Sequence, residues 1–367
     1  MTLHNYRLLL VWIGAGGAVL ARVFPRREER TWTGGTEQRW QWLPALFLII
    51  PLVVWAGFRA DGFGDTAAYR NAFRAAPTGL SALVPYVTAQ SKDWGYAALV
   101  VLFKTLVSRS DAAFFLTVAA VQLLCLAATW RRCSRDYLFS VFLFVASTDY
   151  VAWMYNGMRQ FIAASLIFAC LPLLVRRRYV PAVLVVLLAS LFHGTALLFL
   201  PFVFIVPGRA WNPLTLLFLA AVAAAVFFLD TFTGLLTAVM EETVYAPDVA
   251  DLVNDDGTNL LRVLFYSVPA VMSLVFRRRV ERANDPLVNV CVNLSVVTAG
   301  FYVISHFTSG ILIGRIPIYF SLSNYILLPW LLTEVFTPAS ARELKAVCAG
   351  AYILFFYFQM GVTWGLL

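Results

Sequence analysis

An arginine flanked by two amides lies inside a long apolar region, in the stretch Tyr155–Ala164. Asn156, Arg159 and Gln160 are spaced i, i+3 and i+4, so they would share one face of a continuous helix. An arginine at membrane depth costs about 2.5–3.5 kcal/mol on insertion scales. Snorkelling to the interface or a structural helix–helix hydrogen bond would offset this cost. We favour the alternative that Arg159 binds an anion in a polar cavity.

Two further arginines, Arg262 and Arg315, lie at or just inside the ends of apolar runs. A guanidinium binds phosphate oxygens through two parallel hydrogen bonds and stays charged when it is partly buried. Any one of the three arginines is compatible with a structural role, since the ends of spans often carry arginine. Three of them without a matching number of buried acids indicate an anionic ligand.

His193 is the histidine that lies well inside an apolar run, at a predicted helix break in Phe192-His193-Gly194. A lone buried histidine commonly serves packing, but at such a break a neutral imidazole could accept a proton from a substrate hydroxyl. Asp65 is the competing base, and its structural reading is an N-cap of a helix predicted from Thr66 to Phe73. Neither the histidines nor Asp65 have metal-ligand spacing, so we expect no metal site and no cofactor.

The elements that must position these side chains are membrane spans. Of the 367 residues 61% are hydrophobic and 13% are charged, against about 25% charged in average proteins. Apolar runs of spanning length recur throughout the chain. We therefore expect an all-α polytopic membrane protein, a single membrane domain over residues 1–367 with about twelve transmembrane helices and a re-entrant segment at Trp94–Val107. The net charge of +8 does not indicate nucleic acid binding, because the arginines cluster in short turns between apolar runs.

The positive-inside rule orients the spans. We place in the cytoplasm the basic turns at 22–41, 131–136, 176–178, 207–211, 277–282 and 338–345. The segment 59–93, the acidic loop 230–258 and both termini then lie outside. This arrangement requires that Trp94–Val107 re-enters rather than crosses, and that residues 179–206 form a hairpin of two short helices with His193 near its tip. The external half then holds Asp61, Asp65, Asn156, Arg159, Gln160, His193, Asn259, Arg262, His306 and Arg315.

The order of several short motifs over about residues 60 to 325 resembles that of the EpsG family, Wzy-like polymerases of bacterial exopolysaccharide and O-antigen. The motifs are Gly64-Asp65…Tyr69, Asp93-Trp94-Gly95-Tyr96, Asn156-x-x-Arg159-Gln160-x-x-Ala163, Phe192-His193-Gly194-Thr195-Ala196 and Arg315-x-x-x-Tyr319-Phe320. The chain has Asp93-Trp94-Gly95-Tyr96 where the family commonly shows Glu-Pro-Gly-aromatic, and Gly194 or Thr195 where it shows Ser. The first departure leaves the role of residues 93–96 open.

This resemblance implies a metal-independent glycosyltransferase of GT-C-like character in the bacterial inner membrane, with its active site facing the periplasm. Donor and acceptor would be oligosaccharide repeat units on undecaprenyl diphosphate, and a chain-length regulator would be a further partner. His193, Arg159 and Asp65 would be the catalytic residues, with His193 or Asp65 as the base. The residues expected to bind the substrate or its diphosphate are Arg262, Arg315, Asn156, Gln160, Tyr69, Asn259 and Tyr319.

Three other functions fit parts of this pattern. An O-antigen ligase would use the same donor with a different acceptor. A membrane acyltransferase also carries a histidine at membrane depth, but its active site would open to the cytoplasm. A transporter or flippase for lipid-linked oligosaccharide should line both halves of the membrane with polar residues, whereas here they lie on one side.

Overall fold

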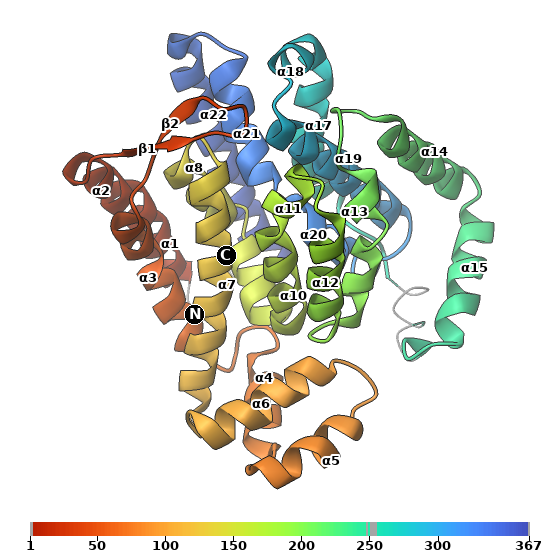
Figure 1. Cartoon of the computed structure of the whole chain (residues 1–367). Coiled ribbons are helices and arrows are strands. Elements are labelled where there is room, and N and C mark those ends of the chain that lie inside the picture. The colour runs from red at the N-terminus through yellow and green to blue at the C-terminus, as the bar shows by residue number, and fades with distance from the viewer. Residues whose placement is uncertain (1–2, 247–248, 250–254, 366–367) are drawn as a thin grey trace. The chain divides into compact units, whose positions relative to one another are not determined.

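A computed structural model of the protein describes residues 3–246, 249 and 255–365, and most of these residues are helical (Figure 1). In the described part, five helices are long and apolar enough to cross a membrane: Tyr6–Val23, Asp111–Cys133, Met158–Val175, Pro286–Phe307 and Pro338–Thr363. The number rises to nine if each of four bent helix pairs counts as one span. The all-α polytopic membrane fold is therefore confirmed, whereas twelve crossings and GT-C-like character stay predictions.

The chain divides into two compact units, which we describe separately. The first consists of Met1–Ala169, Val185–Leu197 and Phe336–Leu367. Its elements are α1 (Leu3–Val11), α2 (Gly17–Val23), β1 (Arg27–Arg30), β2 (Thr36–Arg39), α3 (Trp42–Gly57), α4 (Thr66–Ala75), α5 (Leu83–Thr88), α6 (Trp94–Leu106), α7 (Asp111–Cys133), α8 (Tyr137–Ala146), α9 (Asp149–Val151), α10 (Met158–Ala169) and α22 (Pro338–Phe358).

In the first unit, α4, α5 and α6 pack at the N-terminal end of α7 (Figure 1). The centre of this packing is Phe114 of α7, whose ring centroid lies 4.7 Å from that of Phe73, 5.3 Å from Phe103 and 6.2 Å from Tyr96. Tyr69 and Phe73 are one helical turn apart on α4 and both face this cluster. The segment 59–93, predicted as external with a helix from Thr66, thus contains α4, which packs on α7, and α5, which packs on α6.

Lys104 of α6 forms hydrogen bonds with the C-terminal end of α4. Its buried ammonium donates to the carbonyl oxygens of Phe73 at 2.9 Å and Arg74 at 3.0 Å, and also to that of Ala76. The last carbonyls of a helix have no partner within the helix, and a cation there also interacts favourably with the helix dipole. The buried lysine therefore needs no carboxylate.

Replacing Lys104 with Met should loosen the packing of α4 on α6. The substitution keeps the aliphatic stem but leaves carbonyls at the end of α4 without a donor, so we expect a loss of about 1–3 kcal/mol in stability. Thermal unfolding of the purified protein in detergent measures the effect. Arg109→Met, at an exposed position just beyond α6, is the matched control, and an equal loss in both variants would contradict this role.

Basic turns of the first unit lie together at the C-terminal end of α7. Residues 22–41, predicted as a turn, contain the antiparallel hairpin of β1 and β2, which its charged sequence does not reveal because no apolar alternation marks it. Ion pairs join Arg131 to Glu29 and Arg135 to Glu37, and Lys345 of α22 lies 3.0 Å from Asp136. The turns at 22–41, 131–136 and 338–345 therefore lie together, as expected.

The second unit consists of Cys170–Leu184 and Leu198–Val335. Its elements are α11 (Leu171–Val175), part of α12 (Tyr179–Ser190), α13 (Phe202–Ile205), α14 (Pro213–Phe227), α15 (Leu229–Glu241), α17 (Leu260–Val275), α18 (Arg277–Ala283), α19 (Pro286–Phe307), α20 (Ile318–Ser321) and α21 (Asn324–Glu334). The helix α19 is the centre of this unit, and α14, α17 and α21 pack against it. The predicted acidic loop 230–258 begins with α15 and is therefore not a loop throughout; Asp248 and Asp251 lie outside the described residues.

The predicted hairpin at 179–206 is confirmed. The helix α12 ends at Ser190, and a 3-10 helix begins at Gly194 and leads to α13. The rings of Tyr179 and Phe204 stack with centroids 5.3 Å apart, although a continuous helix would separate these positions by about 37 Å. The chain therefore reverses near His193.

Candidate active site

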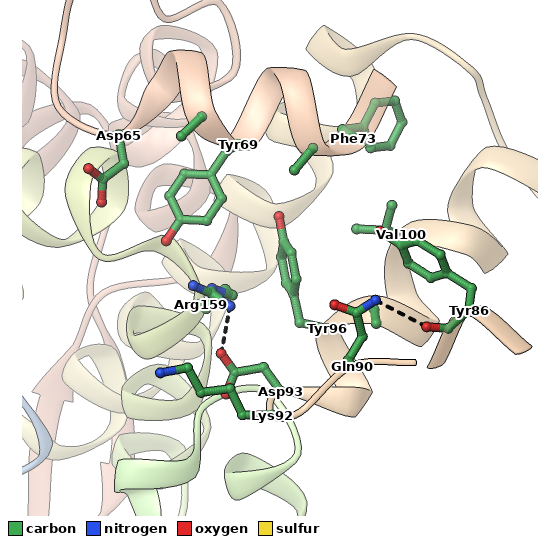
Figure 2. A pocket seen from close by; sticks show the side chains of 13 residues that line it. Asp65, Tyr69, Phe73, Tyr86, Gln90, Lys92, Asp93, Tyr96, Val100 and Arg159 are labelled. Carbon is green, nitrogen blue, oxygen red and sulfur yellow. Dashed lines mark hydrogen bonds and ion pairs between the residues drawn. The ribbon is translucent and has the colours of Figure 1, made fainter. Parts of the chain in front are cut away.

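A cavity of about 270 Å³ lies in the first unit between α4, α6 and the start of α10 (Figure 2). The residues that line it are Asp65, Ala68, Tyr69, Ala72, Phe73, Tyr86, Gln90, Lys92, Asp93, Tyr96, Ala97, Val100 and Arg159. Three residues predicted for the site, Asp65, Tyr69 and Arg159, are thus brought to one cavity from separate parts of the sequence.

Asp93 contacts the other polar groups at one end of this cavity. Its side chain is only 2% exposed, and its Oδ2 lies 2.7 Å from Nη1 of Arg159. Its Oδ1 accepts a hydrogen bond of 3.2 Å from the Gly194 N–H, and Nδ1 of His193 lies 3.6 Å from Oδ2. One carboxylate therefore connects α6, α10 and the tip of the hairpin that carries His193. His193 is partly exposed and lies beside the cavity, next to Asp93, rather than in its lining.

The local sequence of residues 93–96 suits this arrangement. Asp93 precedes α6 in the left-handed region with φ of 61°, which aspartate tolerates better than most residues. The Gly95 N–H donates to the Leu191 carbonyl at 2.7 Å, and a Cβ on Gly95 would lie 2.7 Å from Cβ of Leu191. Only glycine permits this approach. The segment whose role the sequence left open thus supplies the carboxylate, the close contact and, through Tyr96, a cavity wall.

The charge of Asp93 follows from its neighbours. Burial raises the pKa of this carboxyl, but the adjacent His193 and Arg159 side chains and the Gly194 N–H outweigh burial and hold the pKa below its usual range. Asp93 is therefore ionised at neutral pH, where it can pair with a cation.

This lowered pKa predicts how Asp93 contributes to stability. A carboxyl with a folded-state pKa below the unfolded value of about 3.9 stabilises the protein above that value and loses the effect as the pH falls through the folded-state pKa. Asp93→Asn, which suits the left-handed backbone, should therefore lower the melting temperature at pH 7. The difference from the native protein should shrink as the pH falls below about 4, because the carboxyl of the unfolded chain then takes up a proton while that of the folded protein is still ionised. A difference that stays constant from pH 7 to pH 3 would contradict this account.

Arg159 points into the cavity beside Tyr69 and Tyr96 (Figure 2). Its guanidinium carbon lies 6.0 Å and 5.9 Å from the centroids of these rings, within the range of a cation–π contact. The side chain is 37% exposed, so one edge of the guanidinium pairs with Asp93 while the rest is accessible from the cavity. This geometry suits a bidentate contact with an anion that enters the cavity.

The expectation that Asn156, Arg159 and Gln160 share one helical face is wrong. A π-helical turn ends at Asn156, Gly157 has non-helical backbone angles, and α10 begins at Met158. Asn156 packs against Gly64, and Gln160 is buried on α10. Neither residue lines the cavity. The helical pattern failed because a glycine interrupts the helix between the residues that it was meant to align.

The structural reading of Asp65 as a solvated cap is confirmed in its position and exposure, but not in a capping hydrogen bond. Asp65 occupies the N-cap position of α4, but its side chain makes no capping hydrogen bond. It is exposed and lines the cavity instead. Asp65 therefore remains a candidate for chemistry alongside His193.

The other predicted site residues belong to the second unit, near the C-terminal end of α19. Arg262 of α17 lies over the rings of Tyr266 and Tyr302, 5.7 Å and 5.8 Å from their centroids. Asn259 is the N-cap of α17, where its side chain accepts a hydrogen bond from the Leu261 N–H at 2.9 Å. Arg315 ends a 3-10 helix that packs on α19, and Tyr319 is buried.

Residues 257–258 tie the two arginine-bearing segments of this unit to α19. The Thr258 N–H donates to Ser305 O at 2.9 Å, and a Cβ on Gly257 would clash with His306 O. A Cβ on Gly314, next to Arg315, would lie 2.6 Å from Oγ1 of Thr258. Arg262 and Arg315 are therefore held at the same end of α19. That they bind one anion together with Arg159 stays a prediction.

Among the described residues, no group of three or more His, Cys, Asp or Glu side chains could hold a metal ion. A family model, that of the EpsG family, matches residues 42–364 of the 367. The chain belongs to the EpsG family. No curated protein matches it, and no solved structure does. This EpsG protein is thus a polysaccharide-polymerase-like membrane protein of the glycosyltransferase type, and the match includes every predicted site residue, from Asp65 to Tyr319.

Proposed function

We propose that this EpsG protein polymerises oligosaccharide repeat units carried on undecaprenyl diphosphate, at the periplasmic side of the bacterial inner membrane. The observation that carries the proposal is that Arg159 and Asp93 line one end of a polar cavity and that His193 lies beside it, next to Asp93. An arginine that faces the cavity can bind a diphosphate, and a histidine beside a carboxylate can accept a proton. Transfer of a glycosyl group from a lipid diphosphate requires both.

The proposed reaction is a displacement at the anomeric carbon of the donor sugar. The acceptor hydroxyl oxygen bonds to this carbon, its proton passes to His193, and the bond from the carbon to the diphosphate oxygen breaks with its electrons on that oxygen. Arg159 stabilises the charge that develops on the leaving diphosphate, and Lys92 adds a second positive charge in the same cavity. Because Asp93 faces Nδ1 of His193, Nε2 is the nitrogen that accepts the proton.

Within each unit, the candidate site residues lie at the end opposite the basic turns. In the first unit, the cavity lies at the N-terminal end of α7 and the basic turns lie at its C-terminal end, about 34 Å away along a helix of 23 residues. In the second unit, Asn293 near the start of α19 accepts from the Trp211 N–H and donates to Arg209 O, which places the turn 207–211 opposite Arg262 and Arg315. If the basic turns are cytoplasmic, both sets of candidate residues face outward.

Arg262 and Arg315 would bind the substrate or its diphosphate. Arg262 lies over two tyrosine rings, and these cation–π contacts help to hold the guanidinium in place. Asn259 would act through the position of α17, since its side chain caps that helix.

Carbohydrate ladders from a deletion strain test the proposal. The strain should accumulate single lipid-linked units, and the native protein should restore polymer. Long polymer that stays linked to its carrier in the deletion strain would exclude a polymerase and would favour a ligase. Missing single units on the outer face would favour a transporter.

A further inference from the structure

A second cavity in the first unit is apolar. Its volume is about 150 Å³, and it is lined by Leu99, Phe103, Phe114, Thr117, Val118, Val121, Ile162, Leu166 and Phe192, which we call the apolar groove. Thr117 has the one polar side chain in this lining, and its hydroxyl donates to Ala113 O at 2.9 Å. A ligand in the groove therefore meets hydrocarbon and aromatic carbon alone.

The apolar groove begins next to the charged cluster. Ile162 and Leu166 follow Arg159 on α10 by three and seven residues, so they lie on the same side of the helix, about 4.5 Å and 10 Å further along its axis. Phe192 directly precedes His193. The helix α6 lies between the two cavities: Tyr96 and Val100 line the polar one, and Leu99 and Phe103 line the groove.

The groove runs from this cluster along two candidate membrane spans. Its long walls are α7 and α10, which belong to two of the candidate membrane spans. These helices run in the same direction, since Met158 at the start of α10 packs in the cluster around Phe114 and, further along, the rings of Phe168 and Trp130 lie 5.8 Å apart. Val121 is 46% exposed, so the groove opens at the outer surface of α7, a candidate membrane span.

We propose that the apolar groove binds the isoprenoid units next to the diphosphate of the lipid-linked substrate. This inference rests on the proposed function, which places the diphosphate at Arg159. A diphosphate held there must release its chain into the bilayer, and the groove is the apolar path that starts within one turn of Arg159. A sugar in the groove would lose its hydrogen bonds to water without replacing them, whereas an unsaturated hydrocarbon chain packs against Phe103, Phe114 and Phe192.

Photolabelling tests the site independently of catalysis. The probe is undecaprenyl diphosphate with a diazirine on the isoprene nearest the diphosphate, added to the full chain in nanodiscs of phosphatidylethanolamine and phosphatidylglycerol. With the probe well below its own Kd, we expect label on α7 near Val121 and on α10 near Leu166, and a loss of about a hundredfold when unlabelled undecaprenyl diphosphate is added at about a hundred times its Kd. Label elsewhere, or equal competition by extra phosphatidylglycerol, would show that the groove holds bulk lipid only and would overturn the proposal.

Two tryptophan substitutions on α7 separate the groove from the general lipid surface. Val121→Trp fills the groove, whereas Leu124→Trp, at a position 45% exposed outside the lining, adds the same side chain to the same helix. Each buried methylene contributes a factor of about four to affinity, so displacing part of an isoprene unit should raise KM at least ~10-fold while kcat changes less than about twofold. Equal KM values in the two variants would refute the assignment.

The two experiments also distinguish this inference from the proposed function. Specific label in the groove of a protein that makes no polymer would retain the groove and reject the polymerase. Polymer formation without specific label in the groove would retain the polymerase and reject the groove.

Discussion

Arg159→Lys should abolish long polymer, although it keeps the positive charge. A lysine ammonium is a point charge that cannot form the two parallel hydrogen bonds of a guanidinium. A lysine at position 159 could therefore pair with Asp93 or with the leaving diphosphate, but not with both at once. Loss of one preorganised donor to a developing anion typically reduces kcat by about 10²–10³. The measurement is the carbohydrate ladder of the complemented deletion strain, at matched protein expression.

Arg74→Lys is the matched control for this prediction. Arg74 is exposed on α4 and pairs with Asp111 at 2.7 Å, outside the cavity lining. We expect native chain lengths from this variant, because an exposed ion pair contributes little and tolerates lysine. Native chain lengths from Arg159→Lys would show that Arg159 supplies charge alone or is structural, and would remove the bidentate contact from the mechanism.

His193→Ala should reduce the rate of glycosyl transfer by about 10²–10⁴, the range in which a general base contributes. Asp65→Asn should reduce it far less. The reason is position: Nδ1 of His193 faces a buried carboxylate that orients the ring, whereas Asp65 is exposed and its carboxylate makes no capping bond. Rates are measured with the purified protein and a synthetic lipid-linked unit.

Two controls make the comparison of bases decisive. Imidazole added to His193→Ala should restore part of the rate if His193 is a base, whereas a packing residue would not be rescued in this way. Asp61→Asn, which removes an exposed ion pair to Arg70, shows the effect of losing a nearby carboxylate outside the cavity. If Asp65→Asn is inactive while His193→Ala and Asp61→Asn retain activity, Asp65 is the base.

The sequence by itself determined the class of the molecule. Membrane spans, basic turns and the hairpin at His193 could be predicted from local hydropathy and charge. Every segment in the bilayer must be apolar and must satisfy its own backbone hydrogen bonds, and basic residues favour the cytoplasmic side. The order of short motifs was sufficient to recognise the EpsG family, and the family match over residues 42–364 confirms it. Arg159 was singled out because a charged group is conspicuous in an apolar run, and Tyr69 came from the family motif that begins with Gly64-Asp65.

Only the tertiary structure decided which residues meet. Asp93 was absent from the predicted site, because its partners Arg159 and Gly194 lie 66 and 101 residues further along the chain and no local pattern encodes such a contact. Asn156 was included wrongly, since helical spacing assumes a continuous helix and the backbone turns at Gly157. Spacing along a chain predicts a shared face only within one unbroken helix or strand. The pairing of a buried carboxylate with a cation instead depends on tertiary packing, which brings together residues distant in the sequence.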